Sequence, residues 1–479
     1  MKKVIAIFGA LAITAGMTFA QNNQATTTQT GNNNEAEVLQ TGMENEATVG
    51  QAGDNNDALI KQGNFGGGNV QSNYAEGSIE QTGNDNQAEV NQRQGFAGGT
   101  AVSIHSVEQV GNSNKGFLTT FNGGNFGSVE QQGDDNYAKG RQANGPDHDL
   151  TIYQQGNDNQ ADVWQGSGSN NTALIKQGGD IGGDINNNNG IAAIDQKGSD
   201  NMATIQQRQG WNGGTMVSDH SIDQLGDNNW ATFTTFNGGN TGTIDQVGDG
   251  NWAQGRQSVG SGNNIEIAQD GMDNYAKAEQ INSATSTALI TQIGSDNSAD
   301  VDQVGASNSV LIQQGVYGGA ERSVAEFTQN GEDNYLEAKM VKSYDNTITG
   351  SQEGDNNFYR AGVRGSDNTV SMDMVGDANK GSWTVGSLGG WPHQPEGNEV
   401  SIDVEGDGNI TSGTVLGDFN EVTLIQEGND NKIGTLWYSQ DGVHISGEMN
   451  TVSVGQFSDG NSSMNTVVGN GNTINVVQQ

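Results

Sequence analysis

One eleven-residue unit repeats along almost the whole chain, and it restricts the fold more than any other feature. Three copies follow one another directly, at residues 29–40, 40–51 and 51–62. The shared pattern is Asn-x-Ala-x-(Val or Ile)-x-Gln-x-Gly-x-x, and about 37 regular or degenerate copies can be traced. A short fixed period is typical of architectures in which each unit packs only against its neighbours.

Within each unit, the Asn, Ala, Val/Ile and Gln positions fall at every second residue. This is the period of a β-strand, so these four side chains share one face and polar residues take the other. The Gly-x-x-Asn segment predicts a tight turn, because Gly and Asn tolerate positive φ. Two such strands folded across a thin core can bury the shared face. We therefore predict an all-β fold, a β-solenoid of two-strand coils with G-x-x-N turns, about 22 residues per coil and coils ~4.8 Å apart.

The inward-facing Asn and Gln side chains need partners, because an unpaired buried amide costs about 1–3 kcal/mol. In a stack of coils, each amide can bond the same amide one coil away and form a ladder. Ladders are satisfied only in register, so we assign these residues a structural role. The predicted ladder and turn residues are Gln29, Gly31, Asn34, Ala36, Gln40, Gly42, Asn45, Gln81, Gly83, Asn86, Ala88, Gln154, Gly156, Asn159, Ala161, Gln165, Gln196, Gly198, Asn201, Ala203, Gln292, Gly294, Asn297 and Ala299.

A longer period lies over the short one. Turn glycines from Gly53 to Gly156 recur 115 residues later, as Gly168 to Gly271. The sequence between these glycines repeats as well, since residues 119–125 are identical to residues 234–240. A block of units was therefore duplicated as a cassette, and the number of units in it depends on how the long turns are counted.

Residues 1–20 have the features of a secretory signal peptide. Lys2 and Lys3 precede an apolar stretch, and Ala20 provides a small residue at the expected cleavage point. No other stretch approaches 18 apolar residues, so we expect no transmembrane helix. We predict regular repeats with long Gly/Asn-rich turns over 21–380, and a degenerate continuation of the solenoid over 381–479, where Pro392 and Pro395 interrupt the pattern.

Composition excludes several classes of function. The chain has 57 acidic and 19 basic residues, a formal charge of −38, which argues against a nucleic-acid partner. The absence of cysteine excludes disulfides, thiolate metal sites and a Cys nucleophile. The five histidines share no metal-ligand spacing, and no nucleophile or phosphate-binding motif is present. We expect no catalytic residue, no cofactor and no bound metal, and therefore not an enzyme.

Two features allow two interpretations each. Turn aspartates such as Asp134, Asp227 and Asp355 could bind Ca²⁺, or could serve turn formation and solubility. The period of eleven, rather than the nine of a Ca²⁺-binding roll, favours the second interpretation. Three aromatic residues follow ladder asparagines at intervals of two units, so they should stack on the outer face: Trp230, Trp252 and Tyr275. Such a strip could take sugar rings or flat dyes, but packing between the aromatic rings is favoured.

Residues 150–165, with Gln154, Gly156, Asn159, Ala161 and Gln165 at the repeat positions, resemble the curlin repeat. Curlins are subunits of curli, the secreted bacterial amyloid fibres of biofilm matrix. The resemblance implies a secreted, cell-surface structural protein of the extracellular matrix that self-assembles into such fibres and supports cell adhesion. The partners it implies are further copies of the chain, a nucleator and the outer-membrane secretion machinery. The many units and the long turns at 64–69 and 178–190 depart from a typical curlin and leave open whether this is a main subunit, a minor subunit or a cell-bound relative.

The repeat also reaches segments 23–29 and 472–478, with no pattern for a capping helix. Edge strands there would offer unpaired backbone groups to another copy. Head-to-tail coil stacking does not close on itself, so it gives a fibre. The alternative function is that of a monomeric β-solenoid surface adhesin or ligand-binding protein.

Overall fold

The computed structural model describes residues 22–63, 72–93, 102–121, 124–178, 187–208, 217–316, 319–386, 394–434 and 442–479. The expected signal peptide, the long turn at 64–69, most of the turn at 178–190, Pro392 and His393 lie outside these ranges. Within them the regular elements are strands, and no helix is long and apolar enough to span a membrane.

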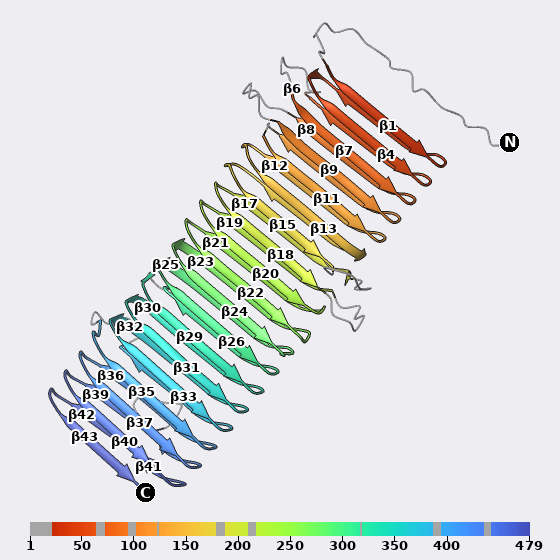
Figure 1. Ribbon diagram of the computed structural model, residues 1–479. Coiled ribbons are helices and arrows are strands. Elements are labelled where there is room, and N and C mark those ends of the chain that lie inside the picture. The colour runs from red at the N-terminus through yellow and green to blue at the C-terminus, as the bar shows by residue number, and fades with distance from the viewer. Residues whose placement is uncertain are drawn as a thin grey trace.

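Two parallel β-sheets face each other along an elongated stack (Figure 1). Successive main strands alternate between the sheets, and we call one strand of sheet A with the sheet B strand that follows it a rung. This confirms the all-β solenoid of two-strand coils. Sheet A contains β1 (Gln24–Thr30), β4 (Glu46–Ala52), β7 (Ala75–Thr82), β9 (Ser103–Val110), β11 (Phe126–Gln132), β13 (Asp149–Asn157), β15 (Thr172–Gln177), β18 (Met202–Arg208), β20 (Trp230–Phe236), β22 (Trp252–Ser258), β24 (Tyr275–Ile281), β26 (Ser298–Val304), β29 (Val324–Asn330), β31 (Thr347–Glu353), β33 (Thr369–Val375), β35 (Glu399–Glu405), β37 (Glu421–Glu427), β40 (Thr451–Gln456) and β43 (Thr473–Gln478).

Sheet B contains β2 (Glu35–Gln40), β5 (Asp57–Gln62), β8 (Gln87–Arg93), β10 (Lys115–Phe121), β12 (Tyr137–Ala143), β14 (Gln160–Gln165), β17 (Ile191–Lys197), β19 (Asp219–Leu225), β21 (Thr241–Val247), β23 (Asn264–Met272), β25 (Thr287–Ser295), β27 (Ser309–Gln314), β30 (Tyr335–Tyr344), β32 (Phe358–Ser366), β34 (Lys380–Val385), β36 (Ile410–Leu416), β38 (Lys432–Ile433), β39 (Val443–Ser446), β41 (Ser462–Ser463) and β42 (Asn465–Val468). Four two-residue strands lie at the edges: β3 (Gly42–Met43), β6 (Ser72–Asn73), β16 (Asn187–Asn188) and β28 (Ala320–Glu321).

Every strand pairs in parallel with its equivalent on the next rung, so residues at the same position of the repeat lie next to each other on adjacent strands. Between β1 and β4, for example, Ala25 pairs with Ala47 and Gln29 with Gln51. The long turn between β5 and β7 leaves this unchanged, since Ala47 pairs with Gly77 and Gln51 with Gln81. Extra residues are therefore accommodated in the turns at the edges, and the inward columns keep their register.

The core is one residue layer from each sheet, made of the Ala and Val/Ile columns. On the rung of β4 and β5, Ala47, Val49, Ala58 and Ile60 are at most 1% exposed. Larger core residues are matched by glycine across the core or on the next rung. An added Cβ on Gly255 would lie 2.5 Å from Cε2 of Phe233, and one on Gly350 would meet Tyr359. The thin core is therefore filled by complementary sizes.

The turns differ from the expectation in one respect. The glycine does take positive φ, 118° at Gly31, but the second such residue is the one before the ladder asparagine, Asn33 at 54°, and not Asn34 itself. A Cβ on Gly31 would also collide with the carbonyl of Gly53 on the next rung. Glycine is needed there both for the backbone angle and for the close approach of stacked turns.

The structure also resolves the cassette. A displacement of 115 residues brings β9 onto β19. One cassette, from β9 to β18, therefore contains nine main strands when the two-residue strand β16 is not counted. Nine is odd, so equivalent strands of the two cassettes lie in opposite sheets.

The pairing of Gly255 with Phe233 gives a test of core packing. We expect Gly255→Ala to destabilise the rungs of β20–β24 by about 1–3 kcal/mol, because the methyl group overpacks the layer. Hydrogen exchange of the amides in these strands measures the loss. Adding Phe233→Ile should restore protection. Gly50→Ala, whose Cβ has its nearest neighbour 3.9 Å away on the outer face, is the matched control; an equal effect there would contradict this account.

Candidate functional site: the amide ladders and the outer faces

A continuous ladder of glutamine amides runs along sheet A. From Gln29 to Gln207, each Nε2 donates to Oε1 of the glutamine on the next rung, at 2.7–2.9 Å. The second amide hydrogen goes to a backbone carbonyl of the opposite strand, as from Gln51 to Glu35 at 2.9 Å. Both donors of a buried side chain are thereby used, which removes the penalty for burying it. This ladder contains Gln29, Gln51, Gln81, Gln109, Gln131, Gln154, Gln177 and Gln207.

Sheet B carries a second ladder with the same direction. It runs Gln40, Gln62, Gln92 and, after an interruption, Gln142, Gln165, Gln196, Gln224, Gln246, Gln269, Gln292 and Gln314. Beyond Gln314 the same column becomes apolar: Met340, Val363, Val385, Val415, Ile445 and Val467. On sheet A, the ladder resumes from Gln257 to Gln352 and again from Gln426 to Gln478, with Met374 and Val404 between.

Histidines bridge the two places where threonine replaces glutamine. Thr120 stands between Gln92 and Gln142, and its side chain is too short to bond both. His105 reaches from the opposite sheet, 2.9 Å from Gln92 Nε2 through Nδ1 and 3.1 Å from Gln142 Oε1 through Nε2. The direction of the ladder makes Nδ1 the acceptor and Nε2 the donor. His220 does the same between Gln207 and Gln257 in the second cassette.

The asparagine ladders run in the opposite direction. The backbone N and Nδ2 of Asn56 donate to Asn34 Oδ1 on the preceding rung, at 2.9 and 3.2 Å. Asn56 Nδ2 also donates to the turn carbonyl of Gly83 at 2.8 Å. One asparagine therefore links its own turn by hydrogen bonds to the turns of the preceding and the following rung, which keeps the turns in register with the strands.

The sequence-predicted ladder and turn residues all occupy these columns. The Asn, Ala and Gln members from Asn45 to Ala299 are buried, with Gln154, Ala161 and Gln165 fully so. The members on the rung of β1 and β2 are exposed or half-buried, since they have a neighbour on one side only among the described residues. Positive φ is found at the glycines of this set, which lie in turns or in the strand ends of β3, β13 and β25: Gly31, Gly42, Gly83, Gly156, Gly198 and Gly294.

Turn aspartates bond from rung to rung. Asp227 N donates to Asp249 Oδ1 at 2.8 Å, and Asn112 N donates to Asp134 Oδ1 at 2.7 Å. One carboxylate oxygen of Asp249 and one of Asp134 thus accept a hydrogen bond from a backbone N–H group. Across the described ranges, no three His, Asp or Glu side chains gather as a metal site.

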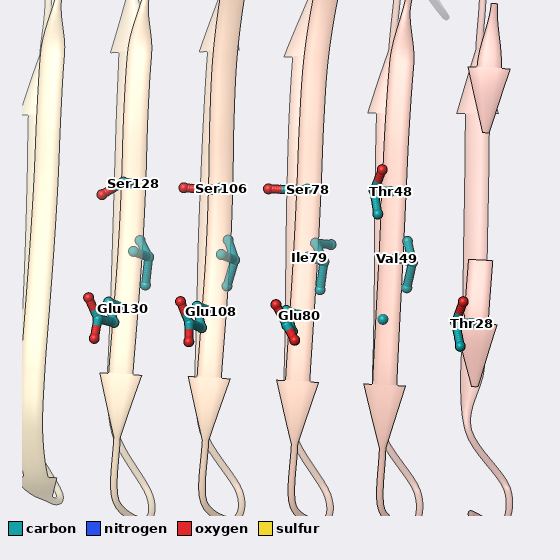
Figure 2. A pocket seen from close by; sticks show the side chains of 13 residues that line it. Thr28, Thr48, Val49, Ser78, Ile79, Glu80, Ser106, Glu108, Ser128 and Glu130 are labelled. Carbon is teal, nitrogen blue, oxygen red and sulfur yellow. The ribbon is translucent and has the colours of Figure 1, made fainter. Parts of the chain in front are cut away.

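The outer faces carry the aromatic and charged residues. Trp230 and Trp252 stack with centroids 4.8 Å apart and planes at 19°, and Trp252 and Tyr275 stack at 4.5 Å and 2°. The ring faces are therefore taken up by one another, which fits packing better than sugar stacking. A shallow groove of about 330 Å³ crosses sheet A over β1 to β11, floored by small residues and bordered by Glu80, Glu108 and Glu130 (Figure 2).

Two features of the ladders were not predicted from the sequence. The bridging role of His105 and His220 depends on contact across the core, although the loss of glutamine at Thr120 and Thr235 was a visible signal. The change to apolar residues after Gln314 was also visible, as Val or Met at the glutamine position of the unit.

Acid should weaken the fold at the bridging histidines. Burial lowers the pKa of His105 and His220 to about 4, against 6.5 for an exposed imidazole. The unfolded chain binds the proton more readily, so stability is complete above pH 6.5 and is lost as the pH falls towards 4, by on the order of 3 kcal/mol per histidine. Denaturant midpoints at pH 7 and pH 4.5 measure this. The double variant His105→Gln/His220→Gln keeps a neutral bridge and should lose clearly less; an equal loss would contradict the assignment.

Comparison with known families gives one match. The curlin-associated repeat matches residues 20–53, 145–179, 239–281 and 285–315. No curated protein matches the chain. The matched segments include the ladder residues of β1 and β2, of β13 to β15, of β21 to β24 and of β25 to β27. The stacked strand-turn-strand rungs and their amide columns account for the repeat physically, and the chain carries curlin-associated repeats over these four segments.

Proposed function

We propose that this protein is a structural subunit that stacks end to end into curli-like amyloid fibres outside the cell, where the fibres form biofilm matrix and support adhesion. The observation that carries the proposal is the pair of open, complementary rung edges. Among the described residues, β1 pairs with β4 alone and β43 with β40 alone. Each leaves one row of backbone donors and acceptors free for another strand.

The hydrogen-bonding direction of the ladders matches one edge to the other. Gln478 Nε2 donates to Ser462 O at 3.0 Å and keeps a second hydrogen, while Gln29 donates to Gln51 and leaves its own Oε1 open. Asn472 donates to Asn450 and leaves Oδ1 open, and Asn23 offers its backbone N–H. Placing β1 of one copy on β43 of another continues both ladders. Joining two β43 edges would instead place the free amide hydrogens of two Gln478 side chains against each other. Joining two β1 edges would place two free Gln29 Oε1 atoms against each other.

Apolar side chains also continue across this junction. Ile474 and Val476 are half-buried against the core and would cover Ala25 and Thr27 of the next copy. On the sheet B side, Met464 and Val468 are 71% and 75% exposed. Val468 lies on the outer face of β42, so the next rung would cover only part of this area and would add to the stability of the junction at roughly 25 cal/mol per Å² covered.

Export and assembly partners complete the proposal. The curlin repeat suggests a structural protein at the cell surface or outside it, and not an enzyme. We propose that residues 1–20 direct secretion and are removed, that secretion machinery and a nucleator act on the chain, and that residues 381–479 continue the solenoid as its less regular end. A monomeric surface adhesin is the second candidate, since the folded rod exposes long faces without needing a partner.

The deciding experiment uses purified residues 21–479, followed by electron microscopy and amyloid-dye fluorescence. We expect fibres that bind dye, elongate from sonicated fragments of themselves and diffract at the strand spacing of ~4.8 Å. A rod that stays monomeric at high concentration and with seeds would contradict the proposal and favour the adhesin.

The edge of β1 allows a sharper test. Gln24 N donates to Asn45 O, and Thr30 O accepts from Gly53 N, so Gln24 and Thr30 bond β4 while the N–H of Thr27 points outward. Thr27→Pro should leave the rod folded but slow seeded elongation at least about tenfold, because proline removes an edge donor. Thr27→Val keeps the N–H and is the control. Equal elongation of both variants would rule out this edge as the junction.

A further inference from the structure

Opposite faces of the same rungs carry opposite charge near the N-terminal end of the rod. The outward residues of β4, β7, β9 and β11 on sheet A include five acids and no base. The outward residues of β5, β8, β10 and β12 on sheet B include five bases and two acids. The acidic patch is Glu46, Glu76, Glu80, Glu108 and Glu130; the basic patch is Lys61, Arg93, Lys115, Lys139 and Arg141.

The acidic patch lacks counter-charges within its own face. Glu80, Glu108 and Glu130 occupy one column on three adjacent strands, one strand spacing apart (Figure 2). Like charges directly opposite on paired strands destabilise a sheet. Gly50, which continues this column on β4, and Ser78 and Ser106 beside the column have small side chains, and they help to form the groove of about 330 Å³. The face is therefore both acidic and hollowed.

The basic patch projects from its face. The Arg141 guanidinium lies 4.0 Å from the Trp164 ring centroid and 5.2 Å from that of Phe121, and Arg93 lies over the other side of Phe121 at 5.6 Å. Within the described residues Arg93, Lys115 and Arg141 form no ion pair. On the same face, Lys61 Nζ lies 3.7 Å from Glu89 Oε1, and Lys139 Nζ lies 3.6 Å from Asp162 Oδ2.

The second cassette repeats this arrangement with the faces exchanged. The 115-residue displacement carries the column Glu80, Glu108 and Glu130 on sheet A to Asp195, Asp223 and Asp245 on sheet B. It likewise carries Lys61, Arg93 and Arg141 on sheet B to Lys176, Arg208 and Arg256 on sheet A. Burial, followed by the neighbouring Asp195 carboxylate, raises the pKa of Asp223, although Lys197, which pairs with Asp195 at 3.0 Å, acts in the opposite direction.

We propose that these faces are a lateral interface between copies of this chain, with sheet A of one rod lying against sheet B of the next, parallel and in axial register. At zero axial offset, the acidic patch faces the basic patch in the first cassette, and Lys176, Arg208 and Arg256 face the acidic column in the second. The contact joins two different faces, so it does not close and builds side-by-side arrays. It uses the side faces alone and does not depend on the proposed end-to-end stacking.

An antiparallel contact of sheet A with sheet A also opposes acid to base, but it leaves the rungs beyond β26 without a partner. The parallel arrangement covers the whole rod, so the structure favours it. Divalent cations between the glutamates are a third explanation, and the experiment below separates all three.

Sedimentation velocity of freshly purified residues 21–479 tests the interface. Side-by-side pairs and larger arrays are expected at about 0.01 M ionic strength, and separate rods at about 1 M, where charges are screened beyond ~3 Å. A triple variant Glu80→Lys/Glu108→Lys/Glu130→Lys and a triple variant Lys61→Glu/Arg93→Glu/Arg141→Glu should each associate at least about tenfold more weakly. Mixing the two variants should restore association, because the reversed sheet A face then meets the reversed sheet B face.

The triple variant Glu326→Lys/Glu399→Lys/Glu421→Lys makes the same change of charge on sheet A within the contact but outside the patches, and it should weaken association far less than either patch variant. An equal weakening there, or no recovery on mixing, would overturn the proposal. Association that requires added Ca²⁺ and survives reversal of the basic patch would overturn it in favour of bridging cations.

Geometry is read from cross-links, since the chain has no native cysteine. Ser106→Cys on sheet A should form disulfides with Thr119→Cys on sheet B in a mixture of the two variants. Linkage of Ser106→Cys to Thr232→Cys instead would show the antiparallel contact and refute the parallel one. Fibres without salt-sensitive pairing would refute this inference and leave the proposed function intact, whereas pairing without fibres would do the reverse.

Discussion

The hydrogen bond between side-chain amides one rung apart is the interaction on which the rest of this structure depends. In most rungs the Ala and Val/Ile columns occupy only part of each strand, and polar side chains fill the rest of the thin core. Glutamine and asparagine fill the remainder at no net cost only if a copy of each lies one strand spacing away. The eleven-residue period, the parallel pairing and the placement of insertions in turns all satisfy this condition.

Opposite directions of bonding in the two kinds of ladder give the rod a polarity. Glutamine Nε2 donates towards the C-terminal rungs, whereas asparagine Oδ1 accepts from them. Each rung is thus a directional template for the next, inside one chain and at a junction between chains. The same geometry explains why a histidine can replace a glutamine: His105 offers one acceptor and one donor at the spacing that two rungs require.

Much of this architecture follows from the sequence, and the reason is physical. The alternation of Asn, Ala, Val and Gln identifies the inward face, and the repeat identifies the neighbours, so residues such as Gln154, Asn159 and Ala161 could be placed without coordinates. Features that depend on contacts across the core could not, as with His105 or the match of Phe233 with Gly255. The charge of each face was also hidden, because it requires knowing in which sheet every strand lies, and the two-residue strand β16 and the long turns obscure that count.

An apolar column replaces the sheet B ladder after Gln314, so the stability of the two parts of the rod should respond differently to temperature. Methyl contacts among Val363, Val385 and Val415 lose strength on cooling, because exposing apolar groups to water is less unfavourable in the cold. Amide-to-amide bonds of the earlier rungs have no such dependence on hydrophobic hydration. Cold should therefore loosen the part of the rod from β30 onward before the rest, so that a chilled rod frays from one end while the other stays intact.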